Sequence, residues 1–415
     1  MAEQAAPTTE RPRDRIEHDG WLAMFVPDST LEGLQAFHFI VKRTYTFAPD
    51  EIAEPTTWQQ AIHLSDQHFE GAGPYEAALR YENELLPPKP GTDVFVTATC
   101  YPPGGEARFC YPEVRVADAH RSRLAVFGDR TAVIKAGQTP LFSAAEKFSA
   151  LPVRYEFAYG GVDRQHSLAP ILCPTNPVGT GYLVQPIDGA PARDQWAVLP
   201  NIEWPDRLLT PETLFVGTKD RKTELRPPAG FGPIPRYWEP RASRAGMPAD
   251  AKPFWKLLYE DKPSVNDEHF LEMQPEFWRS ANGGLVLPVH LEGHEKLVLT
   301  HLHREREELV IRLPIKNPTL RTAINDEAMQ PVPLKLDTVH VEVELGELAL
   351  VWRGSVPKPA SLETLAELER VLMEIDGELI LPAPLLGTGF PLELLTGDFP
   401  GQAILDALPK PPKKG

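Results

Sequence analysis

Proline constrains this chain more than any other feature. There are 45 prolines among 415 residues, about twice the usual ~5%, and they lie among hydrophobic segments instead of in one tract. Because proline removes a backbone donor and fixes φ, it interrupts helices of ordinary length. We therefore expect strands and short helices joined by many ordered loops.

Composition and charge narrow the class of protein. The hydrophobic fraction of 42% and the charged fraction of 24% are typical of a soluble globular chain. The net charge of −16 argues against nucleic-acid or anionic-membrane binding, because phosphate contacts require clustered Lys and Arg. No segment approaches the ~18 apolar residues of a membrane span, and the N-terminal stretch lacks the apolar core of a secretory signal. Cys100, Cys110 and Cys173 are odd in number, which favours core thiols in a reducing cytoplasm over disulfides.

Several segments have the alternation and the β-branched or aromatic content of strands. They are residues 37–47, 92–101, 296–303 and 308–314, a hairpin from 113–118 to 123–128, and a second hairpin around Leu345-Gly346-Glu347. The sequence therefore predicts a mainly β fold. Its core is expected to be an antiparallel, sandwich-like pair of sheets with long Pro/Gly-rich loops and a few short helices, for example at 254–260 and 266–273.

One longer helix is expected near the C-terminus. Leucine and isoleucine repeat there at three- and four-residue spacings, from Leu362 through Leu365, Leu368 and Leu372 to Ile375. Ser361 can cap the start, and Gly377 follows the end. The expected organisation is thus a disordered segment at 1–18, a β domain at 19–358, and an amphipathic helix with a proline-rich tail at 359–415.

The stretch "RYEFAYGG" (154–161) is predicted to be a strand that runs into a tight turn. Side chains alternate along a strand, so Arg154 and Glu156 would share one face and could form an ion pair, while the aromatic rings are buried on the other face. Asp163 could bond back to the turn amides. A catalytic pair of Glu156 and Asp163 is conceivable, but no pattern brings the two together. We expect loop-fixing roles for Arg154, Glu156, Gly160, Gly161, Asp163, Asn176, Gly179, Asn201 and Gly232.

Four histidines cluster in sequence: His290, His294, His301 and His303. On a strand, His301 and His303 would share a face and could bind zinc if another residue supplied a third ligand. The segment after His294 begins like HExxH but has Val298 at the fifth position, so that motif fails. Exposed strand histidines are commoner, and no phosphate loop or serine elbow is present. We therefore expect no metal, no cofactor and no catalytic residues, and a zinc hydrolase stays a minor hypothesis.

Tryptophans gather in the loop-rich middle of the chain: Trp196, Trp204, Trp238, Trp255 and Trp278. Such rings can stack on sugars, anchor a protein partner, or form a small core beneath long loops. A carbohydrate-active enzyme or lectin-like module is therefore an alternative function. As an enzyme it would need two carboxylates roughly 5–9.5 Å apart across a cleft.

Several motifs in order resemble a bacterial family known as domain of unknown function 2169. They are "LRYENELLPPKPGTDVFV", "LAVFGDR", "LPVRYEFAYGGVD", "NPVGTGY", "LPNIE", "PAGFGPIPRYW" and "LDTVHVEVELGELALVWRGSVP". The resemblance runs from about residue 37 to 357. The chain departs from the family's pattern at Thr131-Ala132, where an aromatic residue is common, and it lacks the pentapeptide repeats of some members.

The resemblance implies a cytoplasmic, non-enzymatic adaptor or chaperone of type VI secretion. Such a protein would hold a secreted effector and help to load it onto the valine-glycine-repeat spike protein. The expected partners are those two proteins, with no nucleic acid and no membrane insertion. As partner-binding residues we expect Phe231, Trp238 and Trp255 on the central loops, and Leu365 and Leu372 on the C-terminal helix.

Overall fold

A computed structural model describes residues 15–30, 33–73, 75–135, 137–164, 170–185, 195–217, 226–244 and 275–380. Within these ranges the chain forms strands joined by loops, and each helical segment is a short 3₁₀ turn. The mainly β prediction is therefore confirmed. Trp255 and the expected helices at 254–260 and 266–273 lie outside the described residues.

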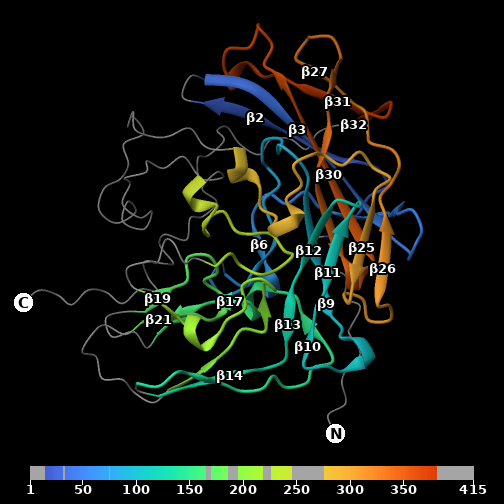
Figure 1. Cartoon of the computed structure of the whole chain (residues 1–415). Helices are drawn as coiled ribbons and strands as arrows, with labels where there is room; N and C mark the ends of the chain where they lie inside the picture. Colours follow the sequence, from blue (N-terminus) through green and yellow to red (C-terminus); the bar gives the residue numbers. More distant parts are fainter. Residues whose placement is uncertain are drawn as a thin grey trace, which may run out of the picture.

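A six-stranded sheet forms the centre of the fold, in the order β2-β3-β30-β29-β8 with β4 paired to β3. Its strands are β2 (Leu22–Thr30), β3 (Gly33–Thr46), β30 (Glu347–Pro357), β29 (Lys335–Glu342), β8 (Asp93–Thr97) and β4 (Glu54–Pro55). Neighbours are antiparallel except β29 and β8, which are parallel. The long strands β3 and β30 run from the top of the molecule to its middle (Figure 1).

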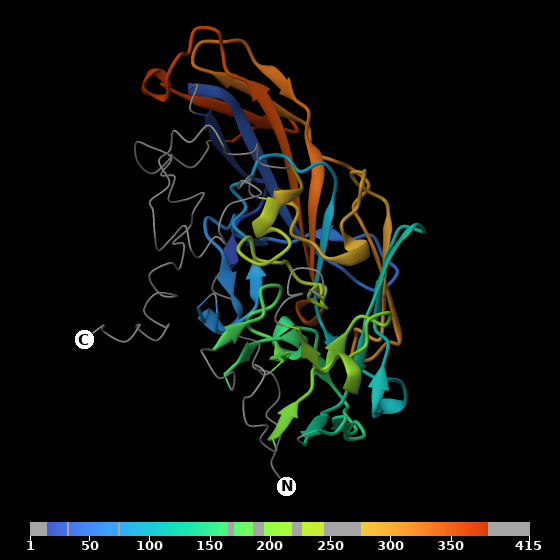
Figure 2. The same ribbon diagram turned by 60° about the vertical axis from the view of Figure 1, so that its left-hand side comes forward.

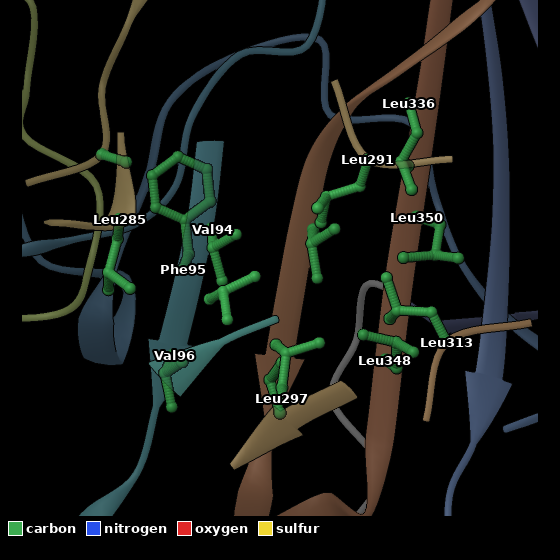
Figure 3. Packing of buried hydrophobic residues seen from close by; sticks show 14 of the residues in the cluster. Val94, Phe95, Val96, Leu285, Leu291, Leu297, Leu313, Leu336, Leu348 and Leu350 are labelled. Carbon is green, nitrogen blue, oxygen red and sulfur yellow. The ribbon is translucent and has the colours of Figure 1, made fainter. Parts of the chain in front are cut away.

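The main core lies against one face of this sheet. Side chains alternate, so Phe37, Phe39 and Val41 of β3 and Leu348 and Leu350 of β30 point to the same side and are buried. Figure 3 shows part of this packing, including Val94 and Val96 of β8 and Leu297 of β25. The burial of these apolar side chains is the largest favourable contribution to folding that the sheet makes.

Two four-stranded sheets contribute to the same core and make it sandwich-like. One has the order β12-β11-β25-β26: β12 (His120–Arg123), β11 (Glu113–Val116), β25 (Lys296–Thr300) and β26 (Glu308–Arg312). The other has the order β28-β27-β31-β32: β28 (Gln330–Val332), β27 (Leu320–Ile324), β31 (Val371–Ile375) and β32 (Glu378–Ile380). The fold class is thus the expected one, with mixed pairing in its central sheet.

Small sheets and loops make up the lower part of the molecule (Figure 2). Some of them surround a second core that includes Tyr159, Tyr182 and Leu214. One of these sheets has three strands: β15 (Leu141–Phe142), β14 (Thr131–Ile134) and β22 (Gln195–Val198). Another joins β10 (Phe109–Cys110), β13 (Ala125–Phe127) and β23 (Ile202–Glu203). The two-stranded sheets pair β1 (Arg15–Glu17) with β5 (Trp58–Gln60), β6 (Gln67–His68) with β7 (Leu79–Tyr81), β16 (Leu151–Pro152) with β9 (Thr99–Cys100), β17 (Tyr159–Gly160) with β20 (Thr180–Gly181), β18 (Val162–Asp163) with β19 (Ile171–Leu172), and β21 (Leu183–Val184) with β24 (Phe215–Val216).

The 3₁₀ turns connect these strands. They are η1 (Phe69–Gly71), η2 (Pro103–Gly105), η3 (Tyr155–Phe157), η4 (Pro211–Thr213), η5 (Ala242–Arg244), η6 (Pro275–Trp278), η7 (Gly283–Leu285), η8 (Val343–Leu345) and η9 (Leu365–Glu367). None of the helices in the described part of the chain has the length and apolar character needed to cross a bilayer.

The prediction of an amphipathic helix near the C-terminus is wrong. Of its leucine stripe, Leu365 lies on the 3₁₀ turn η9, and Leu372 and Ile375 lie on β31, which pairs with β27. The two-residue turn Asp376-Gly377 joins β31 to β32. Its φ values of 52° and 88° are those of a type I′ hairpin turn. Gly377 therefore forms a hairpin and does not cap a helix.

The expected domain limits also change. Leu362 is fully buried in the main core, and β31 belongs to the same sheet as β27, so the boundary at 358/359 does not separate two structural units. At the other end, Arg15–Glu17 form β1, which shortens the expected disordered segment 1–18. Residues 1–14 and the tail beyond 380 lie outside the described residues.

One expected hairpin has a different partner strand. β11 turns back into β12 at His120–Arg123, whereas the following strand β13 leaves for a separate sheet with β10 and β23. The expected hairpin between 113–118 and 123–128 is therefore shifted. The second hairpin, between β29 and β30, is confirmed, and Gly346 supplies the left-handed residue (φ 65°) of its connection.

Candidate functional site

The segment "RYEFAYGG" folds as a 3₁₀ turn at Tyr155–Phe157, not as the expected strand. The predicted ion pair still forms, because Arg154 Nη2 lies 2.5 Å from Glu156 Oε1. Arg154 also donates to Glu70 Oε1 at 2.8 Å, and Glu156 Oε1 accepts the Ala78 amide at 2.9 Å. Burial opposes ionisation of Glu156, but these donors outweigh it and lower the pKa of its carboxyl. The pair therefore ties the turn to the loop around residues 70–78.

Asn176 organises the double glycine. Its fully buried side chain donates to the carbonyls of Tyr155 at 2.8 Å and Tyr159 at 3.1 Å. A Cβ on Gly179 would lie 2.4 Å from Asn176 Nδ2, and one on Gly161 would lie 2.3 Å from the Gly179 carbonyl oxygen. Glycine is required where backbone approaches this closely. These contacts are the ones that a loop-fixing role needs.

The remaining expected loop-fixing residues hold neighbouring segments. Asp163 Oδ2 accepts the Val184 amide at 2.9 Å, and Asn201 Nδ2 donates to Asp129 Oδ1 at 2.9 Å. Gly232 contributes its carbonyl oxygen, which accepts the Tyr155 hydroxyl at 2.7 Å. A Cβ on Gly232 would meet only ordinary contacts, at 3.7 Å from Tyr155, whereas one on Gly230 would lie 2.6 Å from that ring. Of the two, Gly230 is the glycine that packing demands.

A layer of buried ion pairs covers the face of the central sheet opposite the main core. Lys42 of β3 is fully buried, and its ammonium group donates to Glu84 Oε1 at 2.7 Å. Arg353 of β30 is 1% exposed, contacts Asp337, and donates to the Glu84 carbonyl at 2.9 Å. Both cations are strand residues that point away from the apolar core, and the loop after β7 brings Glu84 to them.

Two more carboxylates complete this buried charged layer. Asp93 of β8 accepts from Lys89 Nζ at 3.0 Å and from Arg279 Nε at 2.7 Å. Glu82 lies 2.7 Å from Arg241 Nη2 and accepts the Ser280 hydroxyl at 2.5 Å. Burial raises the pKa of each carboxyl, yet the adjacent cations outweigh burial and lower it below its ordinary value. Both groups are therefore ionised and paired near neutral pH.

The layer has no room for a substrate. The cavity between His63, Tyr81, Glu82 and Arg353 has a volume of about 20 Å³, close to the space of one water molecule. Its acids are neutralised by fixed cations, which is the arrangement of a structural framework and differs from a carboxylate pair that faces a cleft. The layer therefore fixes the loops between 59 and 93 and around 234–244 and 279–282 to the sheet.

His63 lies within this layer and has a distinct environment. Its ring stacks on Tyr81 with centroids 4.5 Å apart, and neither ring nitrogen has a hydrogen-bond partner among the described residues. Burial, followed by the nearby Lys42 charge, lowers its pKa. His63 is therefore neutral at physiological pH.

Two of the expected partner-binding rings, Phe231 and Trp238, lie inside the protein. Phe231 and Trp238 have no exposed area, and Trp238 packs edge-on against Tyr155 with ring centroids 5.5 Å apart. This corrects the expectation that they are exposed anchors. Leu365 packs partly against the main core, and Leu372 is half-buried on β31, so neither belongs to a helical stripe.

His301 and His303, the pair on which the minor zinc hypothesis depends, do not lie on a strand. β25 ends at Thr300, His301 has φ 57°, and the fully buried Leu302 separates His301 from His303. His303 Nδ1 accepts the Glu305 amide at 3.2 Å, and His290 contacts the Lys89 carbonyl at 2.9 Å. Among the described residues no group of three or more His, Cys, Asp or Glu side chains is placed to hold a metal ion.

The structure shows an exposed row of apolar side chains that the sequence analysis did not predict. Leu141, Val133 and Trp196 are 65%, 44% and 63% exposed, and they are direct cross-strand neighbours on β15, β14 and β22. Val198, 47% exposed, lies two residues further on the same face of β22. The opposite face of this small sheet carries Ala132 and packs on the second core. We name Leu141, Val133, Trp196 and Val198 the apolar row.

Large apolar side chains that are adjacent and exposed mark interaction sites more often than isolated ones do. The signal in the sequence was the alternation of residues along the strands "TAVI" and "QWAV", which places every second side chain on the same face. It could not be used without the strand register, because the two segments lie about sixty residues apart in the chain. The apolar row is the candidate site for recognition of another polypeptide.

The described residues form a mainly β protein with a buried ionic framework, hydrogen-bonded loops and an exposed apolar row. Residues 32–353 match the model of the family described as "Uncharacterized protein conserved in bacteria (DUF2169)". That match spans most of the chain, so the chain belongs to this family. No curated protein and no solved structure matches it.

Proposed function

We propose that the protein is a non-enzymatic adaptor of type VI secretion that binds an effector in the cytoplasm and assists its loading onto the valine-glycine-repeat spike protein. The apolar row is the single observation that supports a binding role best. It places four large apolar side chains side by side on a small sheet, outside both cores. The secretion context comes from the family resemblance of the sequence motifs.

The partner surface that suits the apolar row is an apolar segment of the effector polypeptide. The row contains two branched aliphatic types and one indole and no charged side chain, so it offers dispersion and hydrophobic contact instead of ion pairing. Tryptophan is also over-represented among residues that dominate binding energy. The rigid loops below the central sheet favour such a role, because a pre-organised surface loses less entropy on binding.

Co-expression tests the proposal. The full chain is produced with candidate effector and spike proteins from the same organism, and tagged protein is purified under mild conditions. We expect a stoichiometric complex with the effector. Recovery of the adaptor alone, with both candidate partners soluble in the flow-through, would contradict the proposal.

The sugar-binding alternative makes a different prediction. It requires exposed tryptophans beside free carboxylates, and the buried carboxylates described above are occupied by cations. Binding to immobilised glycans that is lost in Trp196→Ala, with no effector complex, would favour the alternative over the adaptor.

A further inference from the structure

An open cavity of about 340 Å³ lies over the sheet β12-β11-β25-β26, on the right-hand side of Figure 1. Its lining includes Arg123 of β12, Glu113 of β11 and Thr300 of β25, and the strand register places these three residues side by side. Val114 and Leu299, their neighbours along β11 and β25, are fully buried in the main core. Because side chains alternate along a strand, the three lining residues point away from that core.

Two aromatic rings form an apolar part of the lining. Phe109 of β10 is 57% exposed, and its ring meets that of Tyr111 edge to face, with centroids 5.9 Å apart and planes at 68°. This is a preferred geometry for aromatic pairs, and a third ring can join it in the same way. The volume of about 340 Å³ is at the lower end of the range for small-molecule sites. The cavity is therefore suited to one ring-bearing group.

Arg123 provides the cavity with a cation whose donors are not used within the described part of the protein. Although Arg123 lies opposite Glu113 in the register, the Glu113 carboxylate is 3.5 Å from Arg115 Nε, and Arg115 also contacts Glu308 at 2.7 Å. The Arg123 guanidinium lies over the Tyr111 ring, 4.7 Å from its centre, and no described residue forms an ion pair or hydrogen bond with it. The attraction to the ring comes from its quadrupole, so the N–H donors stay available for an anion.

The backbone beside the cavity is fixed in an uncommon conformation. His301, which also lines the cavity, has φ of 57°, in the left-handed region that few non-glycine residues adopt. Its amide donates to the Glu307 carbonyl at 2.7 Å, and its carbonyl accepts the Tyr101 amide at 2.9 Å. Such backbone conformations concentrate at ligand sites. These bonds hold this side of the cavity in place before a ligand binds, which lowers the entropy lost on binding.

We propose that this cavity binds a carboxylate that is attached to an aromatic ring. The planar carboxylate accepts hydrogen bonds from the Arg123 guanidinium, and the ring packs beside Phe109 and Tyr111. Such a group occurs in small aromatic acids and at the C-terminus of a polypeptide that ends in an aromatic residue. The inference does not depend on the adaptor function, because the cavity and the apolar row belong to different sheets.

A titration of the full-length protein with N-acetyltryptophan tests the proposal, with isothermal calorimetry as the readout. N-acetyltryptophanamide lacks the carboxylate, and N-acetylalanine lacks the ring. We expect the acid to bind and each analogue to bind at least about tenfold more weakly. A short peptide with tryptophan as its free C-terminal residue separates the two sources. Affinity equal to or above that of N-acetyltryptophan identifies a polypeptide C-terminus, and exclusion of the peptide identifies a small molecule.

Two variants locate the site. Arg123→Gln removes the cation, and Arg121→Gln is the matched control, because Arg121 is exposed on the same face of β12 and does not line the cavity. We expect N-acetyltryptophan to bind at least about tenfold more weakly to Arg123→Gln and equally well to Arg121→Gln. Both side chains are exposed, so the midpoint of thermal unfolding should be unchanged in each variant.

Three results would overturn the proposal: equal affinity of the wild type and Arg123→Gln for N-acetyltryptophan, equal affinity of the wild type for the acid and its amide, or no binding of the acid at millimolar concentration. None of them bears on the complex with an effector, so a failure here is distinguishable from a failure of the proposed function.

Discussion

At the level of single residues, distances between atoms of different segments determine which positions require glycine and which polar groups are paired. Sequence reasoning identified the residues around the double glycine but not their geometry. Arg154 and Glu156 pair as expected, yet they do so across a 3₁₀ turn. Gly232 was expected to have a loop-fixing role, whereas the close approach to Tyr155 occurs at Gly230. Such distinctions depend on distances between segments that are remote in sequence, and no local pattern contains them.

The Gly179→Ala substitution tests the packing around Asn176. The new methyl group would lie 2.5 Å from the Ala158 carbonyl oxygen, so the backbone must shift, and we expect a loss of about 1–3 kcal/mol in the free energy of unfolding. Gly232→Ala is the matched control, because its Cβ meets only ordinary contacts, and it should change stability by less than about 0.5 kcal/mol. Urea denaturation measures both variants. Equal effects of the two substitutions would refute this account of the turn.

His63 predicts a pH dependence of stability. The pKa of its ring is lowered in the folded protein from the ordinary value of 6.5, so below that pH the unfolded state binds a proton that the folded state excludes. This difference in proton binding does not affect stability above pH 6.5. Below pH 6.5 it lowers the free energy of unfolding by about 1.4 kcal/mol per pH unit. The His63→Phe variant retains an aromatic ring beside Tyr81 and removes the titratable group.

We therefore expect wild type and His63→Phe to have similar stabilities near pH 7 and to diverge toward pH 5. The wild type should lose more of its unfolding free energy than the variant. Urea titrations at several pH values give the difference directly. Parallel pH profiles would mean that His63 becomes protonated without unfolding.

At the scale of the element, local periodicity predicted the long strands well and the C-terminal segment badly. β3, β25, β26 and the β29–β30 hairpin have clear alternation or turn signals, and they lie where expected. The leucines of 362–375 match helical spacing by coincidence. The stronger signal was Asp376-Gly377, which favours a hairpin, and pairing with β27 then overrides the helix propensity of the leucines.

Substitutions on β31 distinguish the strand from a helix. In the strand, Met373 is fully buried and Leu372 is on the other face. We expect Met373→Ala to cost about 2–5 kcal/mol and Leu372→Ala less than about 1 kcal/mol in unfolding free energy. A helical stripe would give the reverse order, because Leu372 belongs to that stripe and Met373 does not. Thermal or urea unfolding of the two variants decides between them.

At the scale of the whole molecule, two layers with different roles sandwich the central sheet. One face carries the apolar core, and the other carries the buried charged layer that fixes long loops. The sequence predicted a sandwich-like β fold and rigid loops, because proline, glycine and alternation are local signals. It did not predict the charged layer or the apolar row, since both assemble from segments that only the strand register brings together.

We propose that the apolar row binds an effector polypeptide. The most direct measurement is the dissociation constant of the purified full-length protein with its effector, for wild type, Trp196→Ser and Leu379→Ser. Leu379 is a matched control, because it is 59% exposed on β32, in a different sheet. We predict at least about a tenfold weakening for Trp196→Ser, equivalent to about 1.4 kcal/mol, and an unchanged constant for Leu379→Ser. Equal affinity of all three proteins would contradict the account.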